Sequence, residues 1–384
     1  MANLYSLDRK IQDCKDNICI MDVMFEFDLL PIEQADILYK PPKAIENIYL
    51  SKVEGMLLGT IIGDVLGNKY ESKIPAKKHH MDPIVAYPPK AHFTDDTQFT
   101  FWTLDVFLKE KWLNPESLAK KYIQERIIGI GKSIRSFIKR FKDLKYPWYL
   151  AGVKSAGNGA LMKLSPVVIP HLINPTNCLW ADAVVTTRLI YWDRLAISSA
   201  VAFTYLLWEC FRRNKSPEPE WWLEKYVEIT SELEGHKSKY KPRYPLKSTY
   251  QGPAWLYIEK VLRDALEKNL SLYDLSNNIG SGAYLLETIP NTLYVIMKYA
   301  DNSLLALSKS VTYTKDSDTI GAIVGYIVGA LNGVTSFPKH LLDPIFGQVV
   351  PKNFLNLIFK AEKFLARQRN VNYNGSIIFT SRYK

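Results

Sequence analysis

Cysteine is scarce in this sequence, with four residues among 384. They are Cys14, Cys19, Cys178 and Cys210, and no two of them form a Cys-x-x-Cys pair. Such sparse cysteine excludes a disulfide-rich scaffold and favours a reducing compartment. Histidine is also rare, at six residues, and no two histidines have the spacing of a helical zinc motif.

Long hydrophobic runs are absent as well. The longest apolar stretches, such as Ala196–Trp208, fall short of the roughly 20 residues that cross a bilayer. Met1–Lys10 is polar and lacks the apolar core and cleavage site of a signal peptide. We therefore expect an intracellular protein without membrane contact, located in the cytoplasm, with the nucleus as an open alternative.

A nucleotide-binding P-loop is also missing. The stretch Gly129-Ile130-Gly131-Lys132-Ser133 resembles its end, but the motif needs a glycine five residues before the final glycine. That position is Arg126, and no typical strand precedes it. ATP hydrolysis by this motif is excluded.

The composition that is present describes a globular protein. Hydrophobic residues make up 47% of the chain, which predicts a sizeable core. The net charge is +10, from 49 basic and 39 acidic residues. Such a charge accompanies either a general lysine bias, which we favour, or a polyanionic partner. Nucleic-acid binding is kept as an alternative on one basic stretch: Lys132, Arg135, Lys139, Arg140 and Lys142.

Helical periodicity dominates after residue 50, and strand signals are few. We expect helices near 51–67, 95–109, 115–126, 132–142, 156–164, 178–190, 195–212, 219–233, 251–268, 282–300, 303–311, 318–332 and 352–368. Residues 20–28 alternate apolar and acidic side chains, which favours a strand there. The prediction is an all-α helical bundle, with an N-terminal extension (1–49), a main domain (50–335) and a C-terminal helix and tail (336–384).

Two of the predicted helices carry a glycine at every fourth position. The glycines are Gly55, Gly59, Gly63 and Gly67 in one helix, and Gly321, Gly325, Gly329 and Gly333 in the other. Residues four apart share one helical face. Each glycine costs about 1 kcal/mol relative to alanine inside a helix. A bare face is worth that cost where another backbone must approach closely, so we expect the two helices to form a central pair.

Two acidic clusters lie at predicted helix starts. One is Thr94-Asp95-Asp96-Thr97, and the other is Asp316-Ser317-Asp318-Thr319. Each cluster taken alone is typical of helix N-capping. Each also supplies two carboxylates with hydroxyls, where a cap needs one oxygen. If the two helix starts converge, hard cations such as magnesium must neutralise the crowded carboxylates.

A third stretch, Ser155-Ala156-Gly157-Asn158-Gly159, is a turn of small residues that leads into an apolar segment. Glycine lets backbone amides approach an anion, and a following helix N-terminus favours negative charge. The alternative is an ordinary turn, since Asn-Gly is common in turns.

Taken in order, these motifs resemble the ADP-ribosylglycohydrolase family, which includes bacterial dinitrogenase-reductase-activating glycohydrolases and animal ADP-ribosyl-acceptor hydrolases. The resemblance lies in GMLLGTIIGDVLGNKYE (55–71), FTDDTQFT (93–100), GIG (129–131), SAGNGALMKLSP (155–166), GSGAYLLETIPNTLYV (280–295) and DSDTIGAIVGYIVGALNG (316–333). It implies an orthogonal all-α bundle that hydrolyses the glycosidic bond of ADP-ribose in a modified protein or another ADP-ribose-containing substrate.

The resemblance also implies roles for individual residues. A centre of two Mg²⁺ ions, with Mn²⁺ as the other choice, would be held by Thr94, Asp95, Asp96, Asp316, Asp318 and Thr319. The diphosphate and ribose would contact Gly129, Gly131, Ser155, Gly157, Asn158 and Gly159. Glu71 and Asp96 are the catalytic candidates, as acid or gate and as the group that activates water.

Two positions depart from the family pattern. Lys315 stands where the family has a glycine, and Tyr191 stands at a position where the family often has histidine. These differences support an alternative prediction, a relative that binds ADP-ribose without cleaving it.

Overall fold

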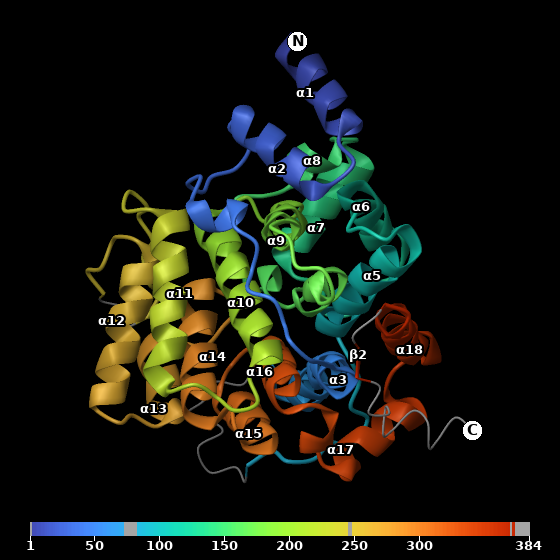
Figure 1. Ribbon diagram of the computed structural model, residues 1–384. Helices are drawn as coiled ribbons and strands as arrows, with labels where there is room; N and C mark the ends of the chain where they lie inside the picture. The colour runs from blue at the N-terminus through green and yellow to red at the C-terminus, as the bar shows by residue number, and fades with distance from the viewer. Residues whose placement is uncertain (1, 73–82, 245–247, 369–370, 373–384) are drawn as a thin grey trace.

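The computed structural model describes residues 2–72, 83–244, 248–368 and 371–372, and most of them are helical (Figure 1). The predicted all-α architecture is confirmed. The one sheet among the described residues has two strands, β1 (Ile48–Tyr49) and β2 (Val371–Asn372), which pair in parallel. This pairing joins the end of the N-terminal extension to the C-terminal tail.

The centre of the molecule is the helix pair α3 (Leu50–Gly67) and α16 (Ser317–Asn332), which carry the two glycine rows. The rows face each other, because a Cβ added at Gly59 or Gly63 would overlap the carbonyl group of Gly325 or Gly321. The predicted close pair is therefore present. Both helices are almost entirely buried, as the sequence of small and apolar residues requires.

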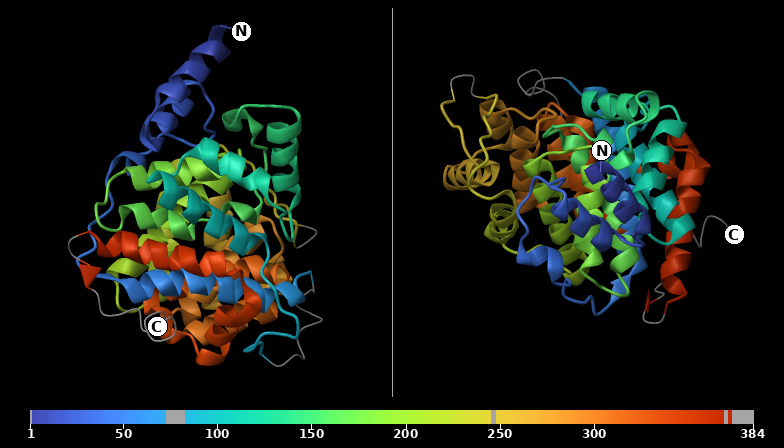
Figure 2. Two further views of the ribbon diagram at one scale, coloured as in Figure 1. Left: turned by 90° about the vertical axis from the view of Figure 1, so that its right-hand side faces the viewer. Right: turned by 90° about the horizontal axis from the view of Figure 1, so that it is seen from above.

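Further helices surround this pair. Those that pack on it or on its neighbours are α5 (Asp95–Glu110), α9 (Cys178–Arg188), α10 (Arg194–Arg212), α11 (Pro219–Glu234), α12 (Ala254–Glu267), α13 (Leu272–Ile279), α14 (Leu285–Tyr299), α15 (Ser303–Tyr313) and α18 (Lys352–Ala366). Smaller helices are α6 (Pro115–Gln124), α7 (Lys132–Ile138), α8 (Trp148–Ala151) and α17 (Lys339–Pro344). Short 3-10 or π turns are η1 (Asp36–Tyr39), η2 (Asn68–Tyr70), η3 (Lys139–Asp143), η4 (Asn158–Ala160), η5 (Ser165–His171), η6 (Val334–Ser336) and η7 (Ile345–Val349). Figure 2 shows α18 lying alongside α3.

The N-terminal extension is helical, and the strand predicted for residues 20–28 is wrong. It forms α1 (Ala2–Asp13) and α2 (Asn17–Glu26). Asp16 caps α2, since its carboxylate accepts a hydrogen bond of 2.8 Å from the Cys19 amide. Short amphipathic helices and strands are hard to separate by periodicity, and here the cap and the packing of α2 against α9 decide.

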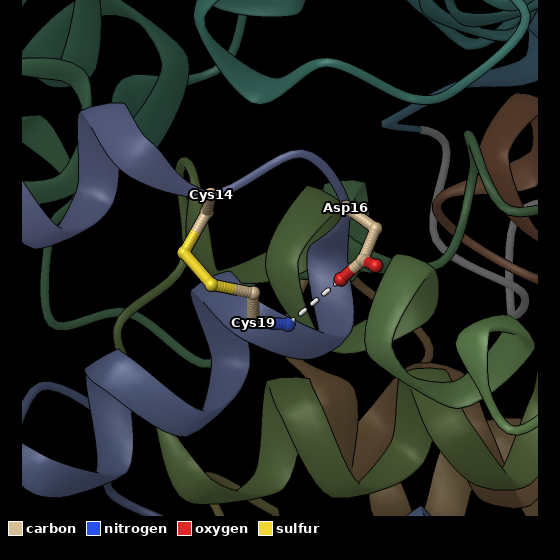
Figure 3. The surroundings of a disulfide bond; sticks show 3 residues. All are labelled: Cys14, Asp16 and Cys19. Atoms are coloured by element: carbon tan, nitrogen blue, oxygen red, sulfur yellow. Dashed lines mark hydrogen bonds between the residues drawn. A yellow bond between two sulfur atoms is a disulfide. The ribbon is translucent and has the colours of Figure 1, made fainter.

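A disulfide joins Cys14 at the end of α1 to Cys19 in α2, with the two Cα atoms 5.5 Å apart (Figure 3). The reducing compartment that the sequence favours stays a prediction, and the other two cysteines, Cys178 and Cys210, are free. A low cysteine count excludes a disulfide-rich scaffold. It does not prevent two cysteines on either side of a tight turn from meeting.

Two details of the predicted helices also differ. The helix expected over 156–164 is only the 3-10 turn η4, because the segment is pinned to residues before α14 by backbone hydrogen bonds. Helix α13 was not expected, although Ser271 caps it through a 3.1 Å bond to the Asp274 amide.

Among the described residues, no helix is both long and apolar enough to span a membrane. The cytoplasmic location stays a prediction from the sequence. The predicted tail beyond residue 372 lies outside the described residues.

Candidate functional site

The two acidic clusters converge at one end of the central helix pair. Thr94 caps α5, and Asp316 lies directly before α16. The clusters touch, because the Thr319 hydroxyl donates a 3.2 Å hydrogen bond to Asp96 Oδ2. The expected meeting of the two helix starts is present.

Asp64 of α3 is the centre of this cluster, although it is not among the site residues predicted from the sequence. It is fully buried. Its carboxylate accepts bonds from the Thr94 amide (2.9 Å), the Thr97 amide (3.1 Å) and the Thr97 hydroxyl (2.6 Å). The available signal was an aspartate inside a glycine-rich apolar helix, since an unpartnered buried charge would be costly there.

The carboxylates form two overlapping groups. Asp64, Asp96 and Asp318 offer oxygens within 4.8 Å of one another, and so do Glu71, Asp316 and Asp318. Asp318 belongs to both groups and links them. Asp95 is in neither group, although it lines the cavity of about 620 Å³ that lies next to the cluster.

Burial raises the pKa values of the aspartates of the cluster, which are Asp64, Asp95, Asp96, Asp316 and Asp318. Burial is the main cause at every position, and it raises the pKa of Asp64 and of Asp316 to about 6. The pKa values of Asp95, Asp96 and Asp318 are also well above their ordinary value, because neighbouring carboxylates add to the effect of burial. Bringing these groups together as anions therefore costs free energy unless a proton or a cation compensates.

One fully buried oxygen of the cluster has no hydrogen-bond partner among the residues that the structure describes. Asp96 Oδ1 is buried and accepts no hydrogen bond, while Asp96 Oδ2 receives both Thr94 (3.0 Å) and Thr319 (3.2 Å). Buried polar atoms are nearly always paired. A set of carboxylate and hydroxyl oxygens with an unpaired carboxylate oxygen suits a hard divalent cation.

The cluster opens into a cavity of about 620 Å³, the central cavity. All six residues predicted for the diphosphate and ribose line it: Gly129, Gly131, Ser155, Gly157, Asn158 and Gly159. Asp95, Asp316, Asp318 and Thr319 also lie on its wall. The structure therefore brings the predicted ligand-binding residues together with most of the predicted metal-binding residues.

The glycine-containing loop Ser155–Gly159 is held in place by hydrogen bonds to other segments of the chain. The Asn158 amide donates to the Ala283 carbonyl at 3.0 Å, and the Leu285 amide donates to the Ala156 carbonyl at 2.9 Å. The Asn158 side chain also donates to Asp316, which ties the loop to the acidic cluster. The Ser155 hydroxyl lies 2.8 Å from the Ser133 hydroxyl of α7.

Gly129 has a positive φ of 80° and lies against the cluster. A Cβ there would be 3.1 Å from Asp95 Oδ1, whereas a Cβ at Gly131 would meet nothing within 4 Å. Gly129 is thus required by its backbone conformation and its close neighbour, and Gly131 is not.

Tyr191 forms part of the cavity wall beneath the glycine loop. It is buried, and its hydroxyl occupies the space that a Cβ on Gly159 would need. Burial raises the Tyr191 pKa, and the charges of Asp95 and Asp96 raise it further. The Tyr191 phenol, which lines the cavity, is therefore uncharged at physiological pH.

A second cavity of about 520 Å³, the side cavity, adjoins the central one. The two share Glu71, Arg243, Ala283 and Asp316. Lys315, which differs from the family pattern, lines the side cavity and not the central one. Glu71 is exposed and lines both cavities.

The basic stretch around α7 is partly used within the fold. Arg135 donates to the Ile130 carbonyl at 2.8 Å, and Arg140 donates to the Gly152 carbonyl at 2.6 Å. These arginines hold the loops on either side of the cavity, which accounts for part of the charge without a nucleic-acid partner.

Comparison with known proteins gives consistent results. The family model for ADP-ribosylglycohydrolase matches residues 46–370. The chain is 21% identical to ADP-ribosylhydrolase ARH3 of Xenopus tropicalis, over 76% of this chain and 90% of that protein. It is 22% identical to ADP-ribosylarginine hydrolase Tri1 of Serratia proteamaculans (strain 568), over 83% of this chain and 82% of that protein.

A solved structure shares the fold. It is titled ADP-ribosylglycohydrolase-related protein complex, and it aligns with a TM-score of 0.59 and 20% sequence identity. The alignment covers 82% of this chain and 98% of the other.

Proposed function

Because this chain belongs to the ADP-ribosylglycohydrolase family, we propose that it removes ADP-ribose from a modified acceptor by hydrolysing the glycosidic bond. The observation that carries the proposal is the unpaired Asp96 Oδ1 within two converging acidic clusters, beside a cavity lined by a glycine loop. Relatives named as an ADP-ribosylhydrolase and an ADP-ribosylarginine hydrolase support it.

Two magnesium ions, or two manganese ions, would be held by the predicted residues together with Asp64. The predicted set is Thr94, Asp95, Asp96, Asp316, Asp318 and Thr319. The two overlapping carboxylate groups that share Asp318 support a count of two. When bound, such cations polarise ribose oxygens and lower the pKa of a water molecule.

Residues of the chain itself bind the substrate and transfer the protons. The backbone amides of the glycine loop and the Ser155 hydroxyl bind the diphosphate and ribose. Asp96, which would also contact a cation, activates the attacking water and accepts its proton. Glu71, exposed at the junction of the two cavities, delivers a proton to the departing acceptor or closes over it.

The second candidate function is ADP-ribose binding without turnover. The observation in its favour is Tyr191, whose buried and neutral ring packs against Gly159 at the position where relatives often carry a titratable histidine. This candidate predicts stabilisation by ADP-ribose without release of product.

The test is release of ADP-ribose from arginine-linked and serine-linked ADP-ribosyl peptides, with magnesium and with EDTA. Metal-dependent release by the wild type, lost in Asp318→Asn, is the expected result. Asp105→Asn is the matched control, because Asp105 lies in α5 and pairs with Lys109 at 2.8 Å. Thermal stabilisation by ADP-ribose without any release would establish the second candidate instead.

A further inference from the structure

Arg243 lies in the segment between α11 and α12 and lines both cavities. It is the one basic residue that the two cavities share, within the part of the chain that the structure describes. Its side chain is 64% exposed. Neither the sequence motifs nor the functional proposal above assigns it a role.

The position of its guanidinium group is set by Tyr284. The Arg243 Cζ atom lies 4.6 Å from the centroid of the Tyr284 ring, a cation–π contact. Tyr284 forms an antiparallel bridge with Gly157 and follows Ala283, whose carbonyl accepts the Asn158 amide. The arginine is therefore held on the residue that is bonded to the glycine loop.

The ion pair that Arg243 makes in this structure is loose. Its Nη1 atom is 3.9 Å from Glu287 Oε1, too far for a hydrogen bond. Glu287 Oε1 is buried and has no hydrogen-bond partner in the described part of the chain, whereas Oε2 accepts the Gly282 amide at 2.8 Å. Because this ion pair includes no hydrogen bond, Arg243 can exchange it for an anion that accepts hydrogen bonds from its guanidinium group.

The charged residues of the central cavity favour an exchange in which Arg243 leaves Glu287 for a bound anion. The wall of this cavity carries four carboxylates (Glu71, Asp95, Asp316 and Asp318) and two basic residues, Lys132 and Arg243. A diphosphate that enters this cavity is attracted by its basic residues as well as by the cations of the proposed function. An arginine fork is well suited to a diphosphate because it donates two parallel hydrogen bonds.

We propose that Arg243 is a further substrate-binding residue, which leaves Glu287 and binds the diphosphate of ADP-ribose in the central cavity. The inference rests on the proposed function, since that function supplies the ligand. The exchange also uncovers Glu287 Oε1 in the side cavity at the moment when the substrate is bound. Binding of the ligand in the central cavity is thereby linked to the release of the Glu287 carboxylate in the side cavity.

The test is calorimetric titration of ADP-ribose into the full-length protein with magnesium. Arg243→Gln should weaken the affinity roughly tenfold, the effect of losing a hydrogen bond to a charged group, and Arg243→Lys should recover part of it. Lys239→Gln is the matched control, because Lys239 lies in the same segment, is exposed and lines neither cavity. It should bind like the wild type.

Glu287→Gln gives a second reading with the opposite sign. It removes the competing carboxylate, so ADP-ribose should bind at least as tightly as in the wild type. Equal affinities of Arg243→Gln and Lys239→Gln, or weaker binding by Glu287→Gln, would overturn the inference while leaving the proposed function intact. A wild type that fails to bind ADP-ribose would instead contradict the proposed function.

Discussion

At the scale of single residues, Asp64 connects α3 to the start of α5. Replacing it with asparagine removes an acceptor oxygen from the bonds that Thr94 and Thr97 donate. We expect Asp64→Asn to lower the free energy of unfolding by about 2 kcal/mol, from hydrogen bonds to a charged group. The rise in melting temperature on adding magnesium should also vanish, as measured by thermal unfolding with and without EDTA.

The control for this prediction is Asp105→Asn, which changes the same charge in α5 on a side chain paired with Lys109 and Lys121. It should keep the full response to magnesium. A normal magnesium response in Asp64→Asn would show that Asp64 only positions Thr94 and Thr97.

At the scale of helices, the contact between α3 and α16 depends on bare backbone. In Gly63→Ala the new methyl group meets the Gly321 carbonyl group, which is backbone and cannot turn away. We expect a loss of about 2 kcal/mol or more in the free energy of unfolding, despite the better helix propensity of alanine. Urea unfolding monitored by circular dichroism measures it.

Gly347→Ala is the comparison for this prediction, because a Cβ at Gly347 meets nothing within 4 Å. Its effect should stay within about 0.5 kcal/mol. Equal stabilities of the two variants would mean that the central helices can separate without cost.

A pair of buried carboxyl groups fixes α18 to α3. Glu54 and Glu362 are 0% and 3% exposed, and burial together with the neighbouring carboxyl group of Glu54 raises the pKa of Glu362 to about 10. The folded protein thus keeps a proton that the unfolded chain releases near pH 4.5. Stability from this proton is present below pH 4.5 and is lost as pH rises towards 10, at about 1.4 kcal/mol per pH unit.

Glu362→Gln replaces the protonated acid with a neutral amide, so it should be more stable than the wild type at pH 8 and similar near pH 4. Its stability should also change less between these pH values. Urea unfolding at a series of pH values measures this, with Glu259→Gln on the surface of α12 as the control. A parallel pH dependence of wild type and Glu362→Gln would rule out the shared proton.

At the scale of the whole molecule, the disulfide constrains only the N-terminal extension. Closing such a short loop stabilises a fold by about 2 kcal/mol in the chain-entropy view. We expect reduction, or the double substitution Cys14→Ser and Cys19→Ser, to lower the free energy of unfolding by about that amount. ADP-ribose affinity should not change, because neither cysteine lines the central or the side cavity. A large loss of affinity on reduction would show instead that the extension controls the site.

Sequence alone determined the features that repeat or cluster locally. The glycine rows, the two acidic clusters and the Ser155–Gly159 loop each have a physical meaning that can be derived from spacing and residue type. The all-α class and the family resemblance follow from them, and both are confirmed. The assignment of metal-binding and catalytic residues stays a prediction, although the structure collects these residues around one cavity.

Only the tertiary structure decided the features that depend on contact between distant segments. Asp64 receives its partners from 30 and 33 residues away, and Arg243 meets Glu287 across a distance in sequence that has no periodic signature. The helix α2 and the Cys14–Cys19 bond likewise depend on packing against α9 and on a tight turn. Local patterns record backbone conformation and burial, whereas the partners of a buried charge are set by which helix ends meet in space.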